Sequence, residues 1–155
     1  MNGILSASSG LPFTISVSDN TSGDASNRDS DRPNLVPGRS NNPVLGNVEQ
    51  WYDPSAFELP AKGPNGETFY GNLGRNTVEG PGLTTFDFSL VKNFNISETN
   101  SLIFRAEFFN IFNHANFGLP ARFGFSASGV AGNAGRITDL TTASRQIQFG
   151  LRYTF

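Results

Sequence analysis

The sequence of 155 residues contains no cysteine, one histidine and one tryptophan. The absence of cysteine excludes disulfides and thiolate metal sites. The histidine, His114, has no second imidazole with which to share a metal ion, and a turn position beside Asn113 is the better interpretation. No spacing of side chains suggests a nucleophile with its base or a set of metal ligands. We therefore expect neither an enzyme nor a bound cofactor.

The chain also lacks an excess of either charge and any long apolar run. Its net charge is -2, and the basic residues are not clustered, which argues against a nucleic acid partner. No stretch approaches the roughly 20 apolar residues of a membrane-spanning helix, so a membrane interpretation must depend on strands. The opening residues lack the charged and apolar regions of an export signal, and none is visible.

Phenylalanine, glycine and proline are abundant instead, with 15, 17 and 9 residues. This composition, with little helical periodicity, predicts strands joined by irregular loops. The clearest pattern lies at the end of the chain, where every second side chain from Ile147 to Phe155 is apolar or aromatic. Such alternation is typical of a β-strand with two unlike faces. An aromatic strand that runs to the last residue suggests a transmembrane β-barrel.

Three other segments read as extended, and long and short connections alternate between them. The predicted strands lie near residues 3–17, 84–96, 101–113 and 145–155, the first broken or bent at Gly10 and Pro12. Residues 18–83 and 114–144 are predicted as long loops, whereas residues 97–100 have the composition of a short turn. Outer-membrane barrels have long outer loops and short periplasmic turns. We therefore predict an all-β fold comprising about four antiparallel C-terminal strands of an outer-membrane barrel, with long extracellular loops and Phe155 on the periplasmic side.

The alternation also assigns side chains to the two faces of the barrel wall. The predicted lipid-facing residues are Phe86, Phe88, Leu90, Phe94, Leu102, Phe104, Phe108 and Phe112. The predicted lumen-facing residues are Asp87, Arg105, Glu107 and Arg152. A hairpin with Ile96 opposite Leu102 would pair Phe94 with Phe104, Leu90 with Phe108 and Phe86 with Phe112.

Two residues, Lys92 and Asn110, fall in the apolar register and interrupt it. A lysine at the bilayer midplane costs roughly 2 to 4 kcal/mol, which falls to near 0 to 1 at the interfaces. Either a bulge re-aims Lys92, or its side chain snorkels toward the lipid headgroups.

The charged residues of the lumen face admit two interpretations. Arg105 and Glu107 lie two residues apart and could bind a plug or a passing solute, because polar lumen positions tune selectivity. A structural, salt-bridged network on the lumen face is the favoured interpretation.

Two further motifs are interpreted as structural rather than functional. Asp19, Asp24, Asp29 and Asp31 offer oxygen ligands, but their spacing matches no calcium loop, and a solvated outer loop is favoured. The glycine-rich runs at 71–74 and 80–82 lack the strand, helix and lysine of a phosphate loop and are predicted as turns.

Several motifs together resemble the C-terminal end of Oar-like TonB-dependent transporters, and the resemblance covers essentially the whole chain. The most specific run is Phe104-Arg105-Ala106-Glu107-Phe108-Phe109-Asn110-Ile111-Phe112-Asn113-His114. The others are Ser9-Gly10-Leu11-Pro12-Phe13, Asp31-Arg32-Pro33-Asn34, Trp51-Tyr52-Asp53-Pro54-Ser55-Ala56-Phe57, Gly71-Asn72-Leu73-Gly74-Arg75-Asn76 and the closing strand. The chain departs from the family pattern at Ala134, where a phenylalanine is expected before Gly135-Arg136-Ile137, so the loop there is expected to be locally altered.

The resemblance implies a barrel of about 22 strands that is plugged by an N-terminal domain and moves large substrates with energy delivered by TonB. The implied location is the outer membrane of a Gram-negative-type bacterium. The implied partners are outer-membrane lipid, the barrel-assembly machinery, the rest of the barrel with its plug, and TonB through an N-terminal part that this sequence lacks. Phe149, Leu151, Tyr153 and Phe155 resemble the terminal signal that the assembly machinery recognises.

Two other functions remain open from the sequence. A soluble secreted β-sheet module could use Trp51, Tyr52 and Phe57 to contact a polysaccharide or a protein. A passive porin would differ from a transporter only in parts that this chain does not contain.

Overall fold

The computed structural model describes residues 1–24, 31–67 and 69–155. These residues form two compact units. The sheet unit comprises Met1–Ser9, Gly82–Asn116 and Leu140–Phe155, and the loop unit comprises Gly10–Pro81 and Phe117–Asp139. Their regular structure is β-strand apart from one 3-10 turn, η1 (Pro54–Ala56). No helix in the described ranges is long and apolar enough to cross a membrane.

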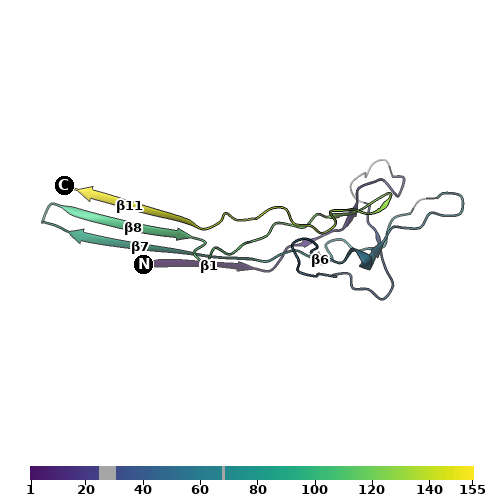
Figure 1. Cartoon of the computed structure of the whole chain (residues 1–155), viewed down its shortest axis with the longest axis horizontal. Helices are drawn as coiled ribbons and strands as arrows, with labels where there is room; N and C mark the ends of the chain where they lie inside the picture. Colours follow the sequence, from purple (N-terminus) through teal and green to yellow (C-terminus); the bar gives the residue numbers. More distant parts are fainter. Residues whose placement is uncertain (25–30, 68) are drawn as a thin grey trace. The chain divides into compact units, whose positions relative to one another are not determined.

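The sheet unit is a four-stranded antiparallel sheet (Figure 1). Its strands, in spatial order, are β1 (Asn2–Ser8), β7 (Leu83–Asn95), β8 (Ser101–Phe109) and β11 (Gln146–Thr154). The C-terminus and the short turn between β7 and β8 lie at the same end of this sheet (Figure 1). At the opposite end the chain leaves β1 and β8 for its long connections. The predicted alternation of short and long connections is therefore present.

Two of the strands are shorter than the sequence indicated. The segment predicted at 3–17 is not one strand, because β1 ends at Ser8, and β2 (Pro12–Phe13) and β3 (Ser16–Val17) belong to two other sheets. A Cβ atom at Gly10 would lie 1.8 Å from the Gly80 carbonyl oxygen, so only glycine fits this close approach. The strand predicted at 101–113 ends at Phe109, because Asn110 and Asn113 adopt positive φ angles of 50° and 52°. Asparagine tolerates this left-handed conformation better than most residues.

The register of the β7–β8 hairpin differs from the predicted one by two residues. Phe94 pairs with Leu102 and Phe88 with Phe108, rather than Phe94 with Phe104 and Leu90 with Phe108. The reason is the position of the turn, which closes with the Ile96 N–H donating to the Asn100 carbonyl (2.9 Å). A shift of two residues leaves every side chain on its predicted face, because strand side chains alternate with period two.

The stretches predicted as long irregular loops, 18–83 and 114–144, instead contribute most of a packed unit. The loop unit contains three small sheets: β2 (Pro12–Phe13) with β6 (Val78–Glu79); β4 (Asn34–Leu35) with β5 (Phe57–Glu58); and β3 (Ser16–Val17), β9 (Phe123–Ser126) and β10 (Gly129–Val130). The buried apolar side chains of the loop unit form one core of Phe13, Ile15, Val17, Tyr52, Ala56, Phe57, Leu73, Val78 and Phe125. The loop unit is thus held together by apolar burial, the dominant favourable term in folding.

Tyr52 lies at the centre of this core and is fully buried. Its ring centroid is 6.1 Å from that of Phe13 and 6.3 Å from that of Phe57, and its hydroxyl donates to the Ala121 carbonyl (3.0 Å). Burial raises the pKa of Tyr52 far above its ordinary value, because the phenolate would lose its hydration. The interpretation of Trp51, Tyr52 and Phe57 as a ligand-contacting surface is therefore wrong. Tyr52 and Phe57 are core residues, and the Trp51 indole donates to the Glu79 carbonyl (2.8 Å).

The solvated loop predicted around the four aspartates is wrong for Asp31, which is buried. Its carboxylate accepts hydrogen bonds from the Ser22 N–H (2.7 Å), the Ser22 hydroxyl (2.8 Å) and the Thr21 hydroxyl (3.1 Å). Asp19 accepts from the Ala127 N–H (2.6 Å), and Asp24 accepts from the Tyr70 hydroxyl (2.7 Å). Asp29 lies outside the described residues. Within them, no group of three potential metal ligands comes together.

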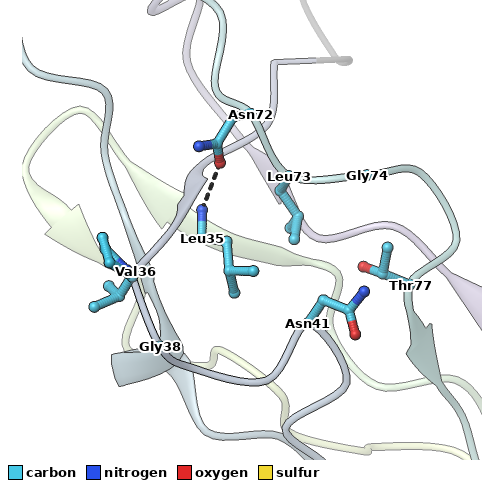
Figure 2. Close-up of a pocket in the computed structure, with 9 residues that line it drawn as sticks. Leu35, Val36, Gly38, Asn41, Asn72, Leu73, Gly74 and Thr77 are labelled. Carbon is cyan, nitrogen blue, oxygen red and sulfur yellow. Dashed lines mark hydrogen bonds between the residues drawn. The ribbon is translucent and has the colours of Figure 1, made fainter.

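The run at 71–74 is not the predicted turn, because its backbone bonds to residues 33 and 34. Its Leu73 N–H donates to the Pro33 carbonyl (3.1 Å), and its Asn72 N–H donates to the Asn34 side chain (2.9 Å). The Asn72 side chain in turn accepts from the Leu35 N–H (2.8 Å), as Figure 2 shows. A Cβ atom at Gly71 would lie 1.9 Å from the Arg32 carbonyl oxygen. Glycine is therefore needed here for close packing of two backbones.

Candidate functional site

The sheet unit has one aromatic face, and the residues predicted to face lipid on β7 and β8 lie on it. Cross-strand partners project to the same side of a sheet, so the observed pairs place these side chains together. Phe88 lies opposite Phe108, and their ring centroids are 6.3 Å apart. Phe149 of β11 continues the cluster, with centroids 6.2 Å from Phe104 and 6.4 Å from Phe108. Contact of this face with lipid stays a prediction.

The four residues predicted as the assembly signal lie along one edge of this face, on β11 and at the residue that follows it. Phe149, Leu151, Tyr153 and Phe155 are exposed by 69%, 70%, 51% and 91%. The rings of Tyr153 and Phe155 stack with centroids 5.9 Å apart. A chain in water rarely leaves so many large apolar side chains uncovered on one strand.

Phe112 joins the aromatic face although it lies beyond β8. Its ring stacks on Phe86 with centroids 5.7 Å apart and an interplanar angle of 26°. The sequence predicted that Phe86 and Phe112 would pair across two strands. The structure brings the two rings together through the turn that follows Asn110.

Lys92 is the one charged residue within the aromatic face of the described sheet. The ladder continues without a bulge from Phe88 to Asn95, with Lys92 opposite Phe104, so a bulge does not re-aim it. Its Nζ lies 5.8 Å from the centroid of the Phe94 ring. Phe94 is two residues nearer the short turn, so the lysine side chain extends toward that end of the sheet. This geometry favours the snorkelling interpretation.

The opposite face of the sheet is more polar, although Ile4, Val91, Ile103 and Phe109 also lie on it, and it contains the four residues predicted to face the lumen. Arg105 lies between Val91 and Gly150, and Glu107 lies between Ser89 and Gln148. The Arg105 Nη1 and Glu107 Oε1 atoms are 3.7 Å apart, which is an ion pair of the kind that the favoured network requires. Because both side chains are partly exposed, the pair adds little stability.

The other two polar residues have different surroundings. Asp87 accepts a hydrogen bond from the Asn110 N–H (2.9 Å), and Arg152 lies opposite Ile103. The sheet therefore separates an aromatic side from a side with available charges, as the wall of a water-filled barrel requires.

A family model for an outer membrane beta barrel domain matches residues 1–148. The chain belongs to this family of outer membrane β-barrels. It is accordingly a protein of the outer membrane of a Gram-negative-type bacterium. No curated protein and no solved structure matches it.

The sequence analysis missed a group of asparagines that fixes one end of the barrel strands. Asn110 is buried, and its side chain bonds to three backbone groups: it accepts from the His114 N–H (3.0 Å) and donates to the carbonyls of His114 (2.9 Å) and Ala143 (3.2 Å). The interruption that Asn110 makes in the apolar register is thus the end of β8. The turn closes with the Asn113 N–H donating to the Asn110 carbonyl (2.8 Å), so His114 follows the turn rather than occupying it as predicted.

Asn116 performs the same task for β7. Its Oδ1 accepts from the Thr84 N–H (2.7 Å), and its Nδ2 donates to the Thr84 carbonyl (3.0 Å) and the Thr142 hydroxyl (2.9 Å). Asn113 accepts from the Arg145 N–H (3.0 Å), just before β11. Three asparagines spaced by three residues at a strand end were the available sequence signal. Together they join β7, β8 and the approach to β11 at the end of the sheet opposite the short turn.

Proposed function

We propose that this chain forms part of the wall of an Oar-like TonB-dependent transporter that moves a large substrate across the outer membrane. The observation that carries the proposal is that the two ends of the sheet differ in the length and structure of their connecting segments. One end has the short turn between β7 and β8, whereas residues 10–81 and 117–139 are inserted at the other end and form a packed unit. Large structured outer segments suit a receptor that captures its substrate outside the cell.

The four-stranded sheet does not transport anything alone. β1 and β11 each have one neighbour, and unpaired backbone groups in hydrocarbon cost several kcal/mol each. In our proposal, further strands of the parent barrel cover both edges, and a plug contacts the polar face through Arg105, Glu107 and Asp87. TonB acts through that plug, and the role requires no catalytic chemistry.

The experiment uses the full-length gene product and the periplasmic domain of TonB from the same bacterium. We expect purified full-length protein to bind TonB, and a version without its plug segment to lose this binding. A gene product that encodes no plug and does not bind TonB would identify a passive porin and overturn the proposal.

We further propose that β11 carries the signal by which the assembly machinery recognises the barrel. Its free edge can add to an exposed strand through backbone hydrogen bonds, while pockets accept alternate side chains. Phe155→Ala in the full-length protein should lower the fraction inserted in the outer membrane severalfold. Thr154→Ala, one residue away on the opposite face, should leave it unchanged. Equal insertion of the two variants would remove the role assigned to Phe155.

A further inference from the structure

Lys92 places a positive charge on the aromatic face of the sheet, and no part of the transport proposal uses it. Its cross-strand partner is Phe104, which in turn pairs with Leu151, and the Leu151 side chain is 70% exposed. The lysine stem therefore starts from a row of apolar side chains. A lysine is costly within the hydrocarbon of a membrane, and the cost falls steeply toward the two interfaces.

The side chain of Lys92 extends toward the next row, which is nearer the short turn. Its Nζ lies 5.8 Å from the centroid of the Phe94 ring, a distance at which an aromatic ring attracts a cation. Phe94 pairs with Leu102, which pairs with Tyr153. Residues two apart on a tilted barrel strand differ in depth by about 5 Å, which the four-carbon stem of lysine can span. The ammonium group can therefore reach the level of Tyr153.

The end of the aromatic face at Tyr153 has the properties of a membrane interface. The rings of Tyr153 and Phe155 stack with centroids 5.9 Å apart, and these side chains are 51% and 91% exposed. Outer-membrane barrels carry girdles of aromatic residues where the apolar band meets the lipid headgroups. The turn at residues 97–100, which follows at this end of the sheet, is entirely polar. Lipid headgroups are therefore expected beside the Lys92 ammonium group.

No carboxylate on the aromatic face of the described sheet can neutralise Lys92. Asp87 lies opposite Ile4 on the polar face, and Glu107 on the same face pairs with Arg105. Lys92 forms no ion pair with any residue in the described ranges. An ammonium group has three N–H donors, so the contact with the Phe94 ring leaves donors for an anionic acceptor.

We propose that Lys92 binds the phosphate group of a phospholipid in the periplasmic leaflet of the outer membrane. The ammonium group donates to phosphate oxygens at the level of Phe94 and Tyr153. Charge complementarity selects this partner, because the phosphate is the anionic group that every phospholipid carries next to its acyl chains. The inference rests on the part of the proposed function that places the sheet in a barrel wall, and it needs neither a plug nor TonB.

The test is solid-state NMR of the full-length protein, labelled with ¹⁵N and ¹³C at lysine, in vesicles of phosphatidylethanolamine and phosphatidylglycerol. The signals of Lys92 are those that disappear in Lys92→Gln and also in Lys92→Arg, which keeps the charge. We expect lipid phosphorus to dephase the Lys92 Nζ signal with a nitrogen–phosphorus distance of about 4 Å, as a direct charge-assisted hydrogen bond requires. We also expect magnetisation transfer from acyl-chain protons to the carbons of the Lys92 stem, which tests lipid contact by itself.

A matched control moves the charge to the other face of the sheet. Asn93→Lys in the Lys92→Gln background places an ammonium group one residue away on the polar face, where Asn93 is exposed and pairs with Ile103. The new lysine signal should show no dephasing by phosphorus. Heat-modifiable migration on gels shows whether each variant has folded.

The possible results separate this inference from the barrel-wall assignment. Acyl-chain contact of the Lys92 stem without phosphorus contact at its Nζ would overturn the proposal and leave the assignment of the aromatic face to lipid intact. Absence of both contacts would overturn the two together. Dephasing at position 93 as strong as at Lys92 would also overturn the proposal, because the contact would then not depend on the aromatic face.

Discussion

At the scale of single residues, asparagine side chains replace backbone partners where the strands of the sheet end. Asn116 pairs with both the N–H and the carbonyl of Thr84, which is the pattern that a neighbouring strand would otherwise provide. Asn110 does the same for His114. Backbone N–H and carbonyl groups that lack partners are costly. These side chains supply the missing hydrogen bonds where the chain leaves the sheet.

Asn116→Ala should therefore be strongly destabilising for its size. Asn116 is 1% exposed, and its removal breaks two hydrogen bonds to the Thr84 backbone, each of which contributes about 0.5 to 1.5 kcal/mol net. Asn95→Ala is the matched control, because that side chain is exposed and such changes usually stay within about 0.5 kcal/mol. Urea unfolding of the lipid-inserted barrel, with hydrogen exchange of the Thr84 amide, measures both. An unchanged exchange rate at Thr84 would contradict the role of Asn116.

At the scale of elements, alternation predicted which side chains share a face but not which residues pair. The faces of β7, β8 and β11 follow from period two alone. The register does not follow from the period, because a turn centred one residue earlier moves the pairing by two residues and leaves the faces unchanged. Strand ends were missed for a related reason: Phe112 continues the apolar pattern, and only the positive φ of Asn110 shows that the strand has already stopped.

The assignment of the two faces can be tested with adjacent substitutions on β11. Phe149→Lys places a charge on the aromatic face, where it should cost about 2 to 4 kcal/mol if that face meets hydrocarbon. Gln148→Lys places the same charge one residue away on the polar face, opposite Glu107, and should cost little. Folding of the full-length barrel into lipid vesicles, followed by heat-modifiable migration on gels, compares them. Equal losses would show that the aromatic face does not contact lipid.

At the scale of the whole molecule, the sequence predicted the sheet far better than the loop unit. The core of the loop unit draws on strands of two to four residues, which are too short to show a period. Its members are also distant in the chain, as Phe13, Tyr52 and Phe125 illustrate. The abundant glycine and proline that suggested irregular loops instead permit close backbone approaches, such as Gly71 against Arg32.

Because the described core residues all belong to the loop unit, a core substitution there should leave the sheet unit intact. Ile15 is fully buried in the loop unit, so Ile15→Val should cost about 0.5 to 1.5 kcal/mol and Ile15→Ala about 2 to 5 kcal/mol. Hydrogen exchange reports each unit separately: the Trp51 and Ile137 amides donate within the loop unit, and the Ile111 amide donates to Phe86 in the sheet unit. We expect the opening free energies of Trp51 and Ile137 to fall in the graded order of the two variants, while that of Ile111 is unchanged. An equal fall in the opening free energy of Ile111 would mean that the two units unfold together. The strands of the sheet would then depend on the loop unit for their stability.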